Sequence, residues 1–381
     1  MKVIITVGTY YPLTDGVQAV TEYLAEGMAE KGYKVIVLTR WFSGMEEKEI
    51  HNRVEIRRCH INTVHALHKG DIDKYQKLAV ELCVDADAIV CVCSQIVTTD
   101  ALLPILRNVK CKKILYMHGM YSFKIKKIEI ETPSLFFHKI WNQIRWGWLY
   151  FGHKKWFEQF DRIIQIHRFD GAYDFIEKHY KKKSDIIENA ADDLFFEESE
   201  RNSPIEGSYI INVSNFIPRK NQLATLEAYY RSITDMSLVL IGSSKTPYYK
   251  EIEEMNEKLK RKYHDKNVIL LTDIPRKEIA TYVRNASLYI MNSRWEVFPI
   301  SLIESMATGV PFITSDVGIA RFLPGGVVAN TVEETQYWID LLSKNSDTAQ
   351  KLGKVGRAFA VENLKIAQKV EQLISLINVQ E

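Results

Sequence analysis

The stretch SRWEVFPISLIESMATGVP, residues 293–311, decides the fold prediction. An apolar strand ends just before it. Pro299 stands where a helix could begin, because the first helical turn does not need the proline N–H. A helix over residues 300–308 is expected, with Gly309 ending it and Pro311 preventing its continuation. A strand–loop–helix unit of this kind is typical of a parallel α/β sheet, whose ligands bind at the carboxyl ends of the strands.

Apolar strands alternate with amphipathic helices along the whole chain, which predicts two parallel α/β halves. In the first half, strands are expected at residues 2–7, 34–39, 88–93, 113–117 and 162–166, with a helix at 19–30. In the second half, strands are expected at 209–213, 237–241, 267–271, 288–291 and 311–314, and helices at 222–232, 276–285, 300–308 and 347–379.

The boundary between the halves is predicted from a change in composition, because residues 191–207 are acidic and rich in turn formers. We therefore expect a Rossmann-like domain over residues 1–190, a linker over 191–207 and a second Rossmann-like domain over 208–360. Residues 361–381 are expected to form a helix that packs back on the first domain.

Charge and cysteine content narrow the class of protein. The 381 residues include 50 Lys and Arg and 48 Asp and Glu, so net charge gives no indication of nucleic acid binding. The five cysteines have no metal-ligand spacing, and Cys91 and Cys93 are expected in a buried strand. An odd cysteine count, with no secretory signal and no apolar run of spanning length, predicts reduced thiols in the cytoplasm.

Several common site motifs are missing from the sequence. Gly8 and Gly16 are too far apart for the dinucleotide fingerprint, and residues 27–34 fail as a phosphate-binding loop because Tyr33 takes the lysine position. No nucleophile elbow and no aspartate-rich or histidine-rich metal motif occurs, so no metal site is predicted.

The helix start within residues 293–311 is a candidate anion site. The backbone N–H groups of Phe298, Ile300 and Ser301 would face an anion there. Glu296 precedes the helix and Glu304 lies inside it, so the two carboxylates would reach hydroxyls on either side of a diphosphate. From the spacing alone, a solvated loop charge at Glu296 and a helix-surface charge at Glu304 remain the alternative, and the spacing by itself favours it.

A second loop, residues 213–222, follows the first strand of the second half. Its Arg219 and Lys220 could neutralise a diphosphate, the first with a planar fork and the second as a point charge. An ordinary basic loop before a helix is the alternative.

Together these segments resemble glycosyltransferase family 4, whose members are retaining enzymes, and the resemblance covers nearly the whole chain. It is most specific in the second half. The matching elements are the E-x7-E pair Glu296 and Glu304, the A-x-G-x-P run from Ala307 to Pro311, the loop from Ser214 to Lys220, the hinge segment from Glu188 to Asp192, His118 with Gly119, and the loop from Tyr11 to Val17.

The resemblance implies the GT-B fold, with two Rossmann-like domains facing a central cleft. It implies a hexosyltransferase that moves a sugar from a UDP-sugar or another nucleoside-diphosphate sugar to a glycan or lipid-linked acceptor, in surface polysaccharide or glycoconjugate synthesis. The acceptor would bind the first domain and the donor the second. No separate cofactor is implied, and fixed cations would replace a divalent ion.

The resemblance also implies a role for each matching residue. Glu304 would hold the ribose hydroxyls, Glu296 the hydroxyls of the donor sugar, and Arg219 and Lys220 the diphosphate. From the first domain, the implied contacts are Gly16 with the phosphate or acceptor and His118 with the donor sugar.

Two positions depart from the family pattern. Asn215 would line the nucleotide-sugar site but stands where the family usually has Arg, so Arg219 is expected to compensate for the missing charge. Asp15 precedes Gly16 where a second glycine is common, and its carboxylate is expected to turn toward the acceptor or to cap the next helix.

Residues 136–157 hold four of the seven tryptophans. One helical face collects the large apolar residues Phe137, Trp141, Ile144, Trp148 and Phe151. Two interpretations stay open: a core helix of the first domain, or docking to an anionic membrane with Lys124, Lys126 and Lys127 just upstream. The second would place the protein at the inner face of the membrane.

Two other functions fit the same architecture. One is an epimerase that acts on a nucleotide sugar, and the E-x7-E loop favours the transferase over it. The other is a non-catalytic scaffold, for which the departure at Asn215 is the single hint.

Overall fold

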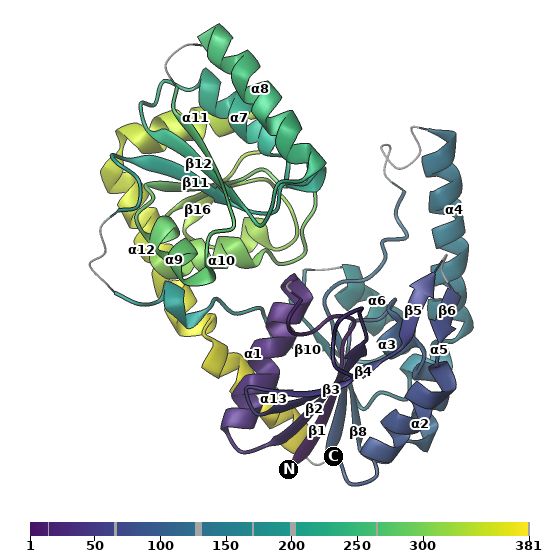
Figure 1. Ribbon diagram of the computed structural model, residues 1–381. Coiled ribbons are helices and arrows are strands. Elements are labelled where there is room, and N and C mark those ends of the chain that lie inside the picture. Colours follow the sequence, from purple (N-terminus) through teal and green to yellow (C-terminus); the bar gives the residue numbers. More distant parts are fainter. Residues whose placement is uncertain are drawn as a thin grey trace. The chain divides into compact units, whose positions relative to one another are not determined.

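The computed structural model describes residues 1–13, 15–64, 67–125, 132–169, 171–198, 203–263 and 266–379. The chain divides into two compact units (Figure 1). The first consists of Met1–Glu188 and Lys369–Glu381, and the second of Asn189–Gln368. Each unit is built on a parallel sheet with helices, so the predicted fold class of two Rossmann-like α/β domains is confirmed.

The first unit has an eight-stranded sheet in the order β10-β9-β8-β7-β1-β2-β4-β3 and a separate hairpin of β5 and β6. All neighbours in the large sheet are parallel except β3, which runs antiparallel to β4 at the edge. The strands are β1 (Lys2–Thr6), β2 (Lys34–Arg40), β3 (Lys48–His51), β4 (Val54–Cys59), β5 (Ile61–Val64), β6 (Leu67–Gly70), β7 (Ala88–Val92), β8 (Lys112–Met117), β9 (Arg162–Gln165) and β10 (Asp185–Ile186).

The helices of the first unit cover its sheet and include the end of the chain. They are α1 (Gly16–Glu30), α2 (Ile72–Leu82), α3 (Val97–Asp100), α4 (Pro133–Gly147), α5 (Lys154–Phe157), α6 (Gly171–Tyr180) and α13 (Ile366–Asn378). The predicted buried strand at 88–93 is β7, in which every residue is buried. All five cysteines are free thiols, and Cys93 lies just beyond the strand.

The second unit has a six-stranded parallel sheet in the order β13-β12-β11-β14-β15-β16. Numbered from its own first strand, this order is 3-2-1-4-5-6, the doubly wound arrangement in which the chain changes direction between strands 1 and 4. The strands are β11 (Tyr209–Val213), β12 (Ser237–Gly242), β13 (Val268–Thr272), β14 (Leu288–Met291), β15 (Phe312–Thr314) and β16 (Gly326–Val328).

The helices of the second unit follow the predicted alternation. They are α7 (Gln222–Arg231), α8 (Pro247–Tyr263), α9 (Arg276–Arg284), α10 (Ile300–Thr308), α11 (Val332–Lys344) and α12 (Ser346–Asn363). The helix α10 has the predicted bounds, with Pro299 at its N-cap and Gly309 in the left-handed conformation (φ 80°) at its end. The expected turn chemistry at both ends is thus confirmed.

The end of the chain forms two helices where one continuous tail helix was predicted. A break at Leu364 and Lys365 separates α12, in the second unit, from α13, most of which belongs to the first. Val370 of α13 packs on α1 at Gly27, where a Cβ would lie 2.5 Å from the valine side chain. Lys112 donates to the carbonyls of Leu376 and Ile377, 3.2 Å each, at the α13 terminus.

The predicted linker, residues 191–207, does not stand apart from the two units. Its described residues belong to the second unit. It contains a short 3-10 turn, Asp193–Phe195. Residues 199–202 of this prediction, and the lysines at positions 126 and 127, lie outside the described residues.

The core interpretation of the apolar helical face in residues 136–157 is wrong. Its five large apolar residues, three on α4 and two on the turn that follows, are at least half exposed, and the buried residues of α4 are Lys139 and Trp146. Lys139 donates to the carbonyl of Ser122 (3.0 Å) and lies over the Tyr121 ring, so this side of the helix is the one that packs inward. The next turn, Trp148–Gly152, is π-helical and does bury Leu149 and Tyr150.

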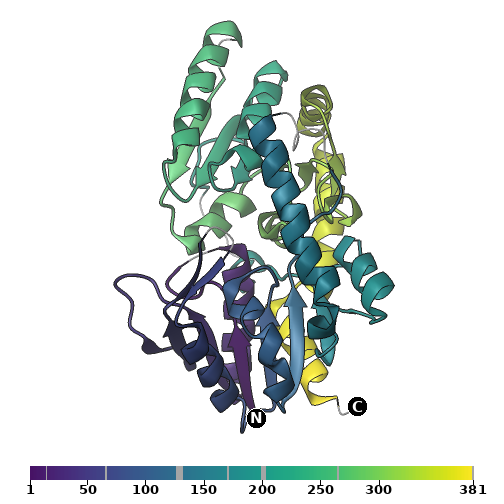
Figure 2. The same cartoon turned by 90° about the vertical axis from the view of Figure 1, so that its right-hand side faces the viewer.

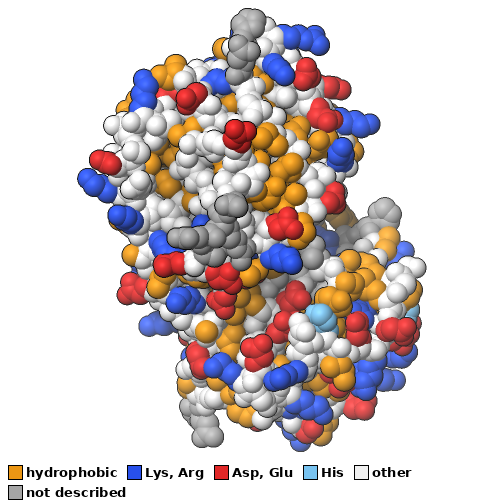
Figure 3. Space-filling model, turned by 60° about the vertical axis from the view of Figure 1, so that its left-hand side comes forward, with side chains coloured by type: hydrophobic (Ala, Val, Ile, Leu, Met, Phe, Trp, Pro, Cys, Tyr) orange, Lys and Arg blue, Asp and Glu red, His pale blue; other side chains and the backbone are white. Residues whose placement is uncertain are grey.

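Acidic and basic side chains are interspersed on the face of the molecule in Figure 3, in keeping with the near-zero net charge. Within the described ranges, no helix combines the length and the apolar character needed to cross a bilayer.

Candidate active site

The switch point of the second sheet places two loops side by side. β11 and β14 are parallel neighbours, and the loops 214–221 and 292–299 follow their carboxyl ends. The Tyr289 hydroxyl donates to the Val213 carbonyl (3.1 Å), and the Asn212 amide donates to the Ile290 carbonyl (2.7 Å). Both candidate loops of the sequence are therefore held at the place where doubly wound sheets bind ligands.

The two loops contact each other through the predicted site residues. The N–H of Arg294 donates to the carbonyl of Arg219 (2.8 Å), and the Arg219 guanidinium lies 5.3 Å from the Trp295 ring centroid. Nζ of Lys220 lies 2.6 Å from Oε1 of Glu296, with side chains only 15% and 10% exposed. The structure thus brings together a predicted phosphate cation and a predicted sugar carboxylate.

The first loop is fixed by its own polar contacts. Nε2 of the buried Gln222 donates to Oγ of Ser214 (2.9 Å) and to the carbonyl of Asn215 (3.0 Å). Asn221 has a left-handed conformation (φ 55°) between the turn Pro218–Lys220 and α7. Lys220 is therefore held by the backbone, while Asn215 is exposed.

Glu304 has a partner that the sequence analysis missed. It is 2% exposed, and its carboxylate pairs with Nη2 of Arg276, the first residue of α9. Burial raises the pKa of Glu304, and Arg276 opposes that rise. The Arg276 side chain is 47% exposed, lies over the Phe195 ring and has Asp192 3.6 Å away. The sequence offered one indication of this contact. Arg276 follows the carboxyl end of the predicted strand at 267–271, the edge where ligands of parallel sheets bind.

The start of α10 is packed into the second unit. The carbonyl of Phe298 accepts a hydrogen bond from the Asn189 amide (3.1 Å), and Ser301 hydrogen-bonds with Tyr289, whose pKa burial raises. Ile300 is the first residue of the helix, so its N–H and that of Ser301 belong to the first turn and have no carbonyl partner within α10. These groups give the helix start its positive potential.

Gly318 is a second residue that the sequence analysis missed. It has φ +54°, and a Cβ there would lie 2.1 Å from the carbonyl oxygen of Val297. The N–H of Ile319 donates to that same carbonyl (3.1 Å), and Ser315 Oγ donates to the Ser293 carbonyl (2.6 Å). The segment after β15 therefore supports the loop that carries Glu296.

In the first unit, Gly16 is the first residue of α1, the helix that follows β1, and His118 directly follows β8. Asp15 caps α1 by accepting from the N–H groups of Val17 (2.9 Å) and Gln18 (2.8 Å), so the capping alternative is confirmed. A Cβ on Gly16 would meet no described atom within 4 Å. Burial lowers the pKa of His118 to about 4, against an opposing effect of Asp15, and its buried Nε2 has no hydrogen-bond partner among the described residues.

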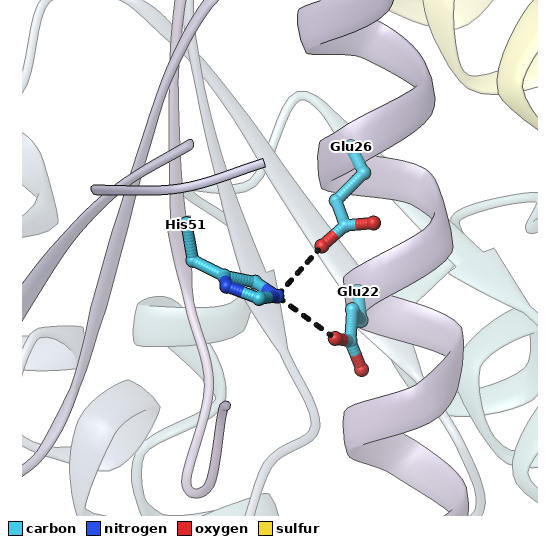
Figure 4. Close-up of side chains that lie close together, drawn as sticks. All are labelled: Glu22, Glu26 and His51. Atoms are coloured by element: carbon cyan, nitrogen blue, oxygen red, sulfur yellow. Dashed lines mark ion pairs between the residues drawn. The ribbon is translucent and has the colours of Figure 1, made fainter. Parts of the chain in front are cut away.

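One group of described side chains is compact enough to consider as a metal site. Glu22 and Glu26 of α1 and His51 of β3 have ligand atoms within 4.8 Å of one another (Figure 4). Nε2 of His51 lies 3.7 Å from Glu26 and 3.9 Å from Glu22, and Glu26 also accepts from Asn52 (3.0 Å). With Tyr11 stacked on His51 at 3.6 Å, the group has the geometry of an ion-pair cluster that joins α1 to the edge strand when His51 is protonated.

Most of the second unit is similar to a known family. Residues 195–359 match the family "Glycosyl transferases group 1". The matched residues include Lys220, Arg276, Glu296 and Glu304, so the switch-point loops and the buried ion pair both lie within the match. No curated protein sequence matches the chain significantly.

Solved structures similar to the whole chain are GT-B glycosyltransferases. Sucrose-phosphate synthase from Thermosynechococcus elongatus has a TM-score of 0.73 at 18% identity, covering 99% of this chain and 98% of that one. Anabaena HepE in complex with UDP has a TM-score of 0.72 at 14% identity, covering 99% of each chain. WaaG, a glycosyltransferase involved in lipopolysaccharide biosynthesis, has a TM-score of 0.69 at 18% identity, covering 99% and 100%. The likeness to these structures shows a shared fold, and the family match of residues 195–359 supports a glycosyltransferase.

Proposed function

We propose that the chain transfers a sugar from a nucleoside-diphosphate sugar to a hydroxyl group of a glycan or lipid-linked acceptor. The observation that carries the proposal is the 2.6 Å pairing of Lys220 with Glu296 at the switch point of the second sheet. A diphosphate needs a fixed cation, and a sugar needs a strong hydrogen-bond acceptor for its hydroxyls. The family match of residues 195–359 supports the same reading.

Each group at the switch point has a proposed role in donor binding. Lys220 and Arg219 meet the diphosphate, and Glu296 exchanges its lysine partner for hydroxyls of the donor sugar. The first-turn N–H groups of Ile300 and Ser301 add the positive potential of a helix start. Without the donor, Lys220 and Glu296 neutralise each other, which keeps two nearly buried charges paired.

Glu304 is the proposed acceptor for the ribose hydroxyls. In this structure Arg276 occupies its carboxylate. Because the Arg276 side chain is about half exposed, it can turn into water when the ribose arrives, at the cost of a partly solvated ion pair. The exposed Asn215 supplies no charge, so the diphosphate depends on Arg219 and Lys220.

The reaction breaks the bond between sugar C1 and a diphosphate oxygen, and the electron pair leaves with the diphosphate. The acceptor hydroxyl oxygen bonds to C1, and its proton goes to the departing phosphate oxygen. Lys220 and Arg219 stabilise the charge that develops on the leaving group, an effect typically worth 10²–10³-fold in rate for one aimed group. Retention of configuration at C1 rests on the family resemblance.

The first unit is proposed to complete the site, with Gly16 near the phosphate or acceptor and His118 near the donor sugar. His118 is neutral at pH 7 because its pKa lies near 4, so it serves as a hydrogen-bonding group and not as a cation. A hexose donor and a role in surface polysaccharide or glycoconjugate synthesis are the finer part of the proposal. They are supported by resemblance and by neighbours such as WaaG.

A panel of nucleoside-diphosphate sugars tests the proposal. Each donor is incubated with and without free sugars, sugar phosphates and glycolipid extract, and the released nucleotide is measured. Release that depends on an acceptor is the expected result. Conversion of one nucleotide sugar into another without release would make the protein an epimerase, and no reaction with any donor would contradict transfer.

A further inference from the structure

The exposed side of α4 and of the π-helical turn that follows it is apolar. Phe137, Trp141 and Ile144 of α4 are 69%, 56% and 62% exposed, and Trp148 and Phe151 of the turn are 58% and 50% exposed. At 3.6 residues per turn, Phe137, Trp141 and Ile144 fall within an arc of roughly 60° on α4. Together with Trp148 and Phe151 they form a surface that we call the aromatic face. A surface helix normally turns its apolar stripe toward the core, and this one turns it toward solvent.

The aromatic face is large for a water-exposed surface. Side chains of this size have about 150–250 Å² each, so five of them at these exposures present on the order of 600 Å². That equals or exceeds the largest apolar patch of a typical monomeric protein, which marks it as a binding surface. Figures 1 and 2 show α4 extending beyond the rest of the first unit.

The charges around the aromatic face have one predominant sign. Residues 132–157 contain no Asp or Glu. Lys154 pairs with Glu158 (3.2 Å), and Lys155 beside it is exposed. At its C-terminal end, the Phe151 ring contacts His179 of α6 (5.3 Å). Residues 177–183, around that histidine, hold four lysines and one glutamate.

We propose that the aromatic face lies in the headgroup region of an anionic lipid bilayer, with the exposed Lys155, Lys178, Lys181 and Lys183 on the anionic headgroups. Tryptophan and phenylalanine on one helical face with flanking basic residues are the composition of interfacial membrane helices. A second copy of the chain fits less well, because residues 132–157 hold no acidic side chain that could meet the basic residues of the other copy in a two-fold contact. That the docked protein acts on a lipid-linked acceptor rests on the proposed function, whereas the docking itself does not.

Vesicle flotation tests the docking without any sugar donor. We expect the protein to float with phosphatidylcholine vesicles containing about 30 mol% phosphatidylglycerol, and at least ~10-fold less with phosphatidylcholine alone. High salt is expected to weaken the binding. No binding at low salt, or equal binding to the neutral and anionic vesicles, would overturn the proposal.

Matched variants assign the binding to the aromatic face. Phe137→Ser with Trp141→Ser and Trp148→Ser should fold normally, because all three are exposed, and should lose at least ~10-fold in vesicle binding. The control replaces Ile50 and Val84, 71% and 80% exposed elsewhere in the first unit, by Ser and should bind like the wild type. Wild-type binding by the triple variant would refute the assignment. So would an oligomer in gel filtration that the triple variant abolishes while neither protein binds vesicles.

Discussion

Removing either partner of the Glu304–Arg276 pair should have unequal effects on stability. Arg276→Met leaves Glu304 as a carboxylate that is 3% exposed and has lost its cation, which typically costs 3–5 kcal/mol. Because water can enter where the half-exposed arginine stood, we expect about 3 kcal/mol. Glu304→Gln leaves Arg276 47% exposed and solvated, so its cost should be about 1 kcal/mol.

The larger cost should also depend on pH. Burial raises the pKa of Glu304, so the folded protein holds this proton at a pH where the unfolded chain has lost it. Without Arg276 the pKa rises further, and the penalty for an ionised Glu304 is present at high pH and disappears as the carboxyl protonates. The destabilisation by Arg276→Met should therefore be smaller at pH 5 than at pH 8.

Urea-dependent hydrogen exchange of peptides from α9 and α10 measures this stability in the second unit alone, which global unfolding of a two-unit chain does not. The reasoning predicts a cost for Arg276→Met at pH 8 about three times that for Glu304→Gln. Equal costs for the two variants, or a cost for Arg276→Met that is the same at both pH values, would refute it.

Three further predictions concern the loops and the first unit. Gly318→Ala places a Cβ 2.1 Å from the Val297 oxygen, so it should displace the loop that carries Glu296. The transfer rate in steady-state kinetics should fall at least ~10-fold. An unchanged rate would show that Gly318 does not support this loop. Gly16→Ala meets no described atom, so its melting temperature should not change while the KM for donor or acceptor rises, and an unchanged KM would remove Gly16 from the site. Burial raises the pKa of Asp100 to about 7, so its ionisation should cost the fold up to about 4 kcal/mol as pH rises from 4 to 7. Asp100→Asn should therefore be more stable than wild type at pH 8 and equal to it at pH 4, as measured by urea-dependent hydrogen exchange of peptides from α3 and β7 in the first unit. The same difference at both pH values would contradict this.

The sequence predicted the second sheet well because its signals are local. The bounds of β11, β14 and α10 match the structure. In each case an apolar run is bordered by turn formers, and Gly309 ends its helix through its own backbone conformation. Strands at the edge of a sheet were harder to predict from the sequence. The short strand Lys48–His51 is half exposed and charged, so it has no apolar pattern to detect.

Only part of the candidate site could be predicted from the sequence. Residues near the E-x7-E loop could be found by motif, whereas the Arg276–Glu304 contact joins two helices that follow different strands and depends on the sheet order. The α4 helix shows the same limit. Its periodicity correctly gave one apolar face, but periodicity does not say which partner covers that face, and the inward side is held by Lys139 through a hydrogen bond.

The most direct test of the central claim is acceptor-dependent nucleotide release by purified Lys220→Ala and Glu304→Ala, with the best donor of the panel. The control is Lys258→Ala, an exposed lysine on α8. Both site variants should lose at least ~100-fold in transfer rate, the scale of one aimed transition-state group, while the control keeps the wild-type rate. Near wild-type rates in both site variants would contradict the assignment of the donor site to the switch point of the second sheet.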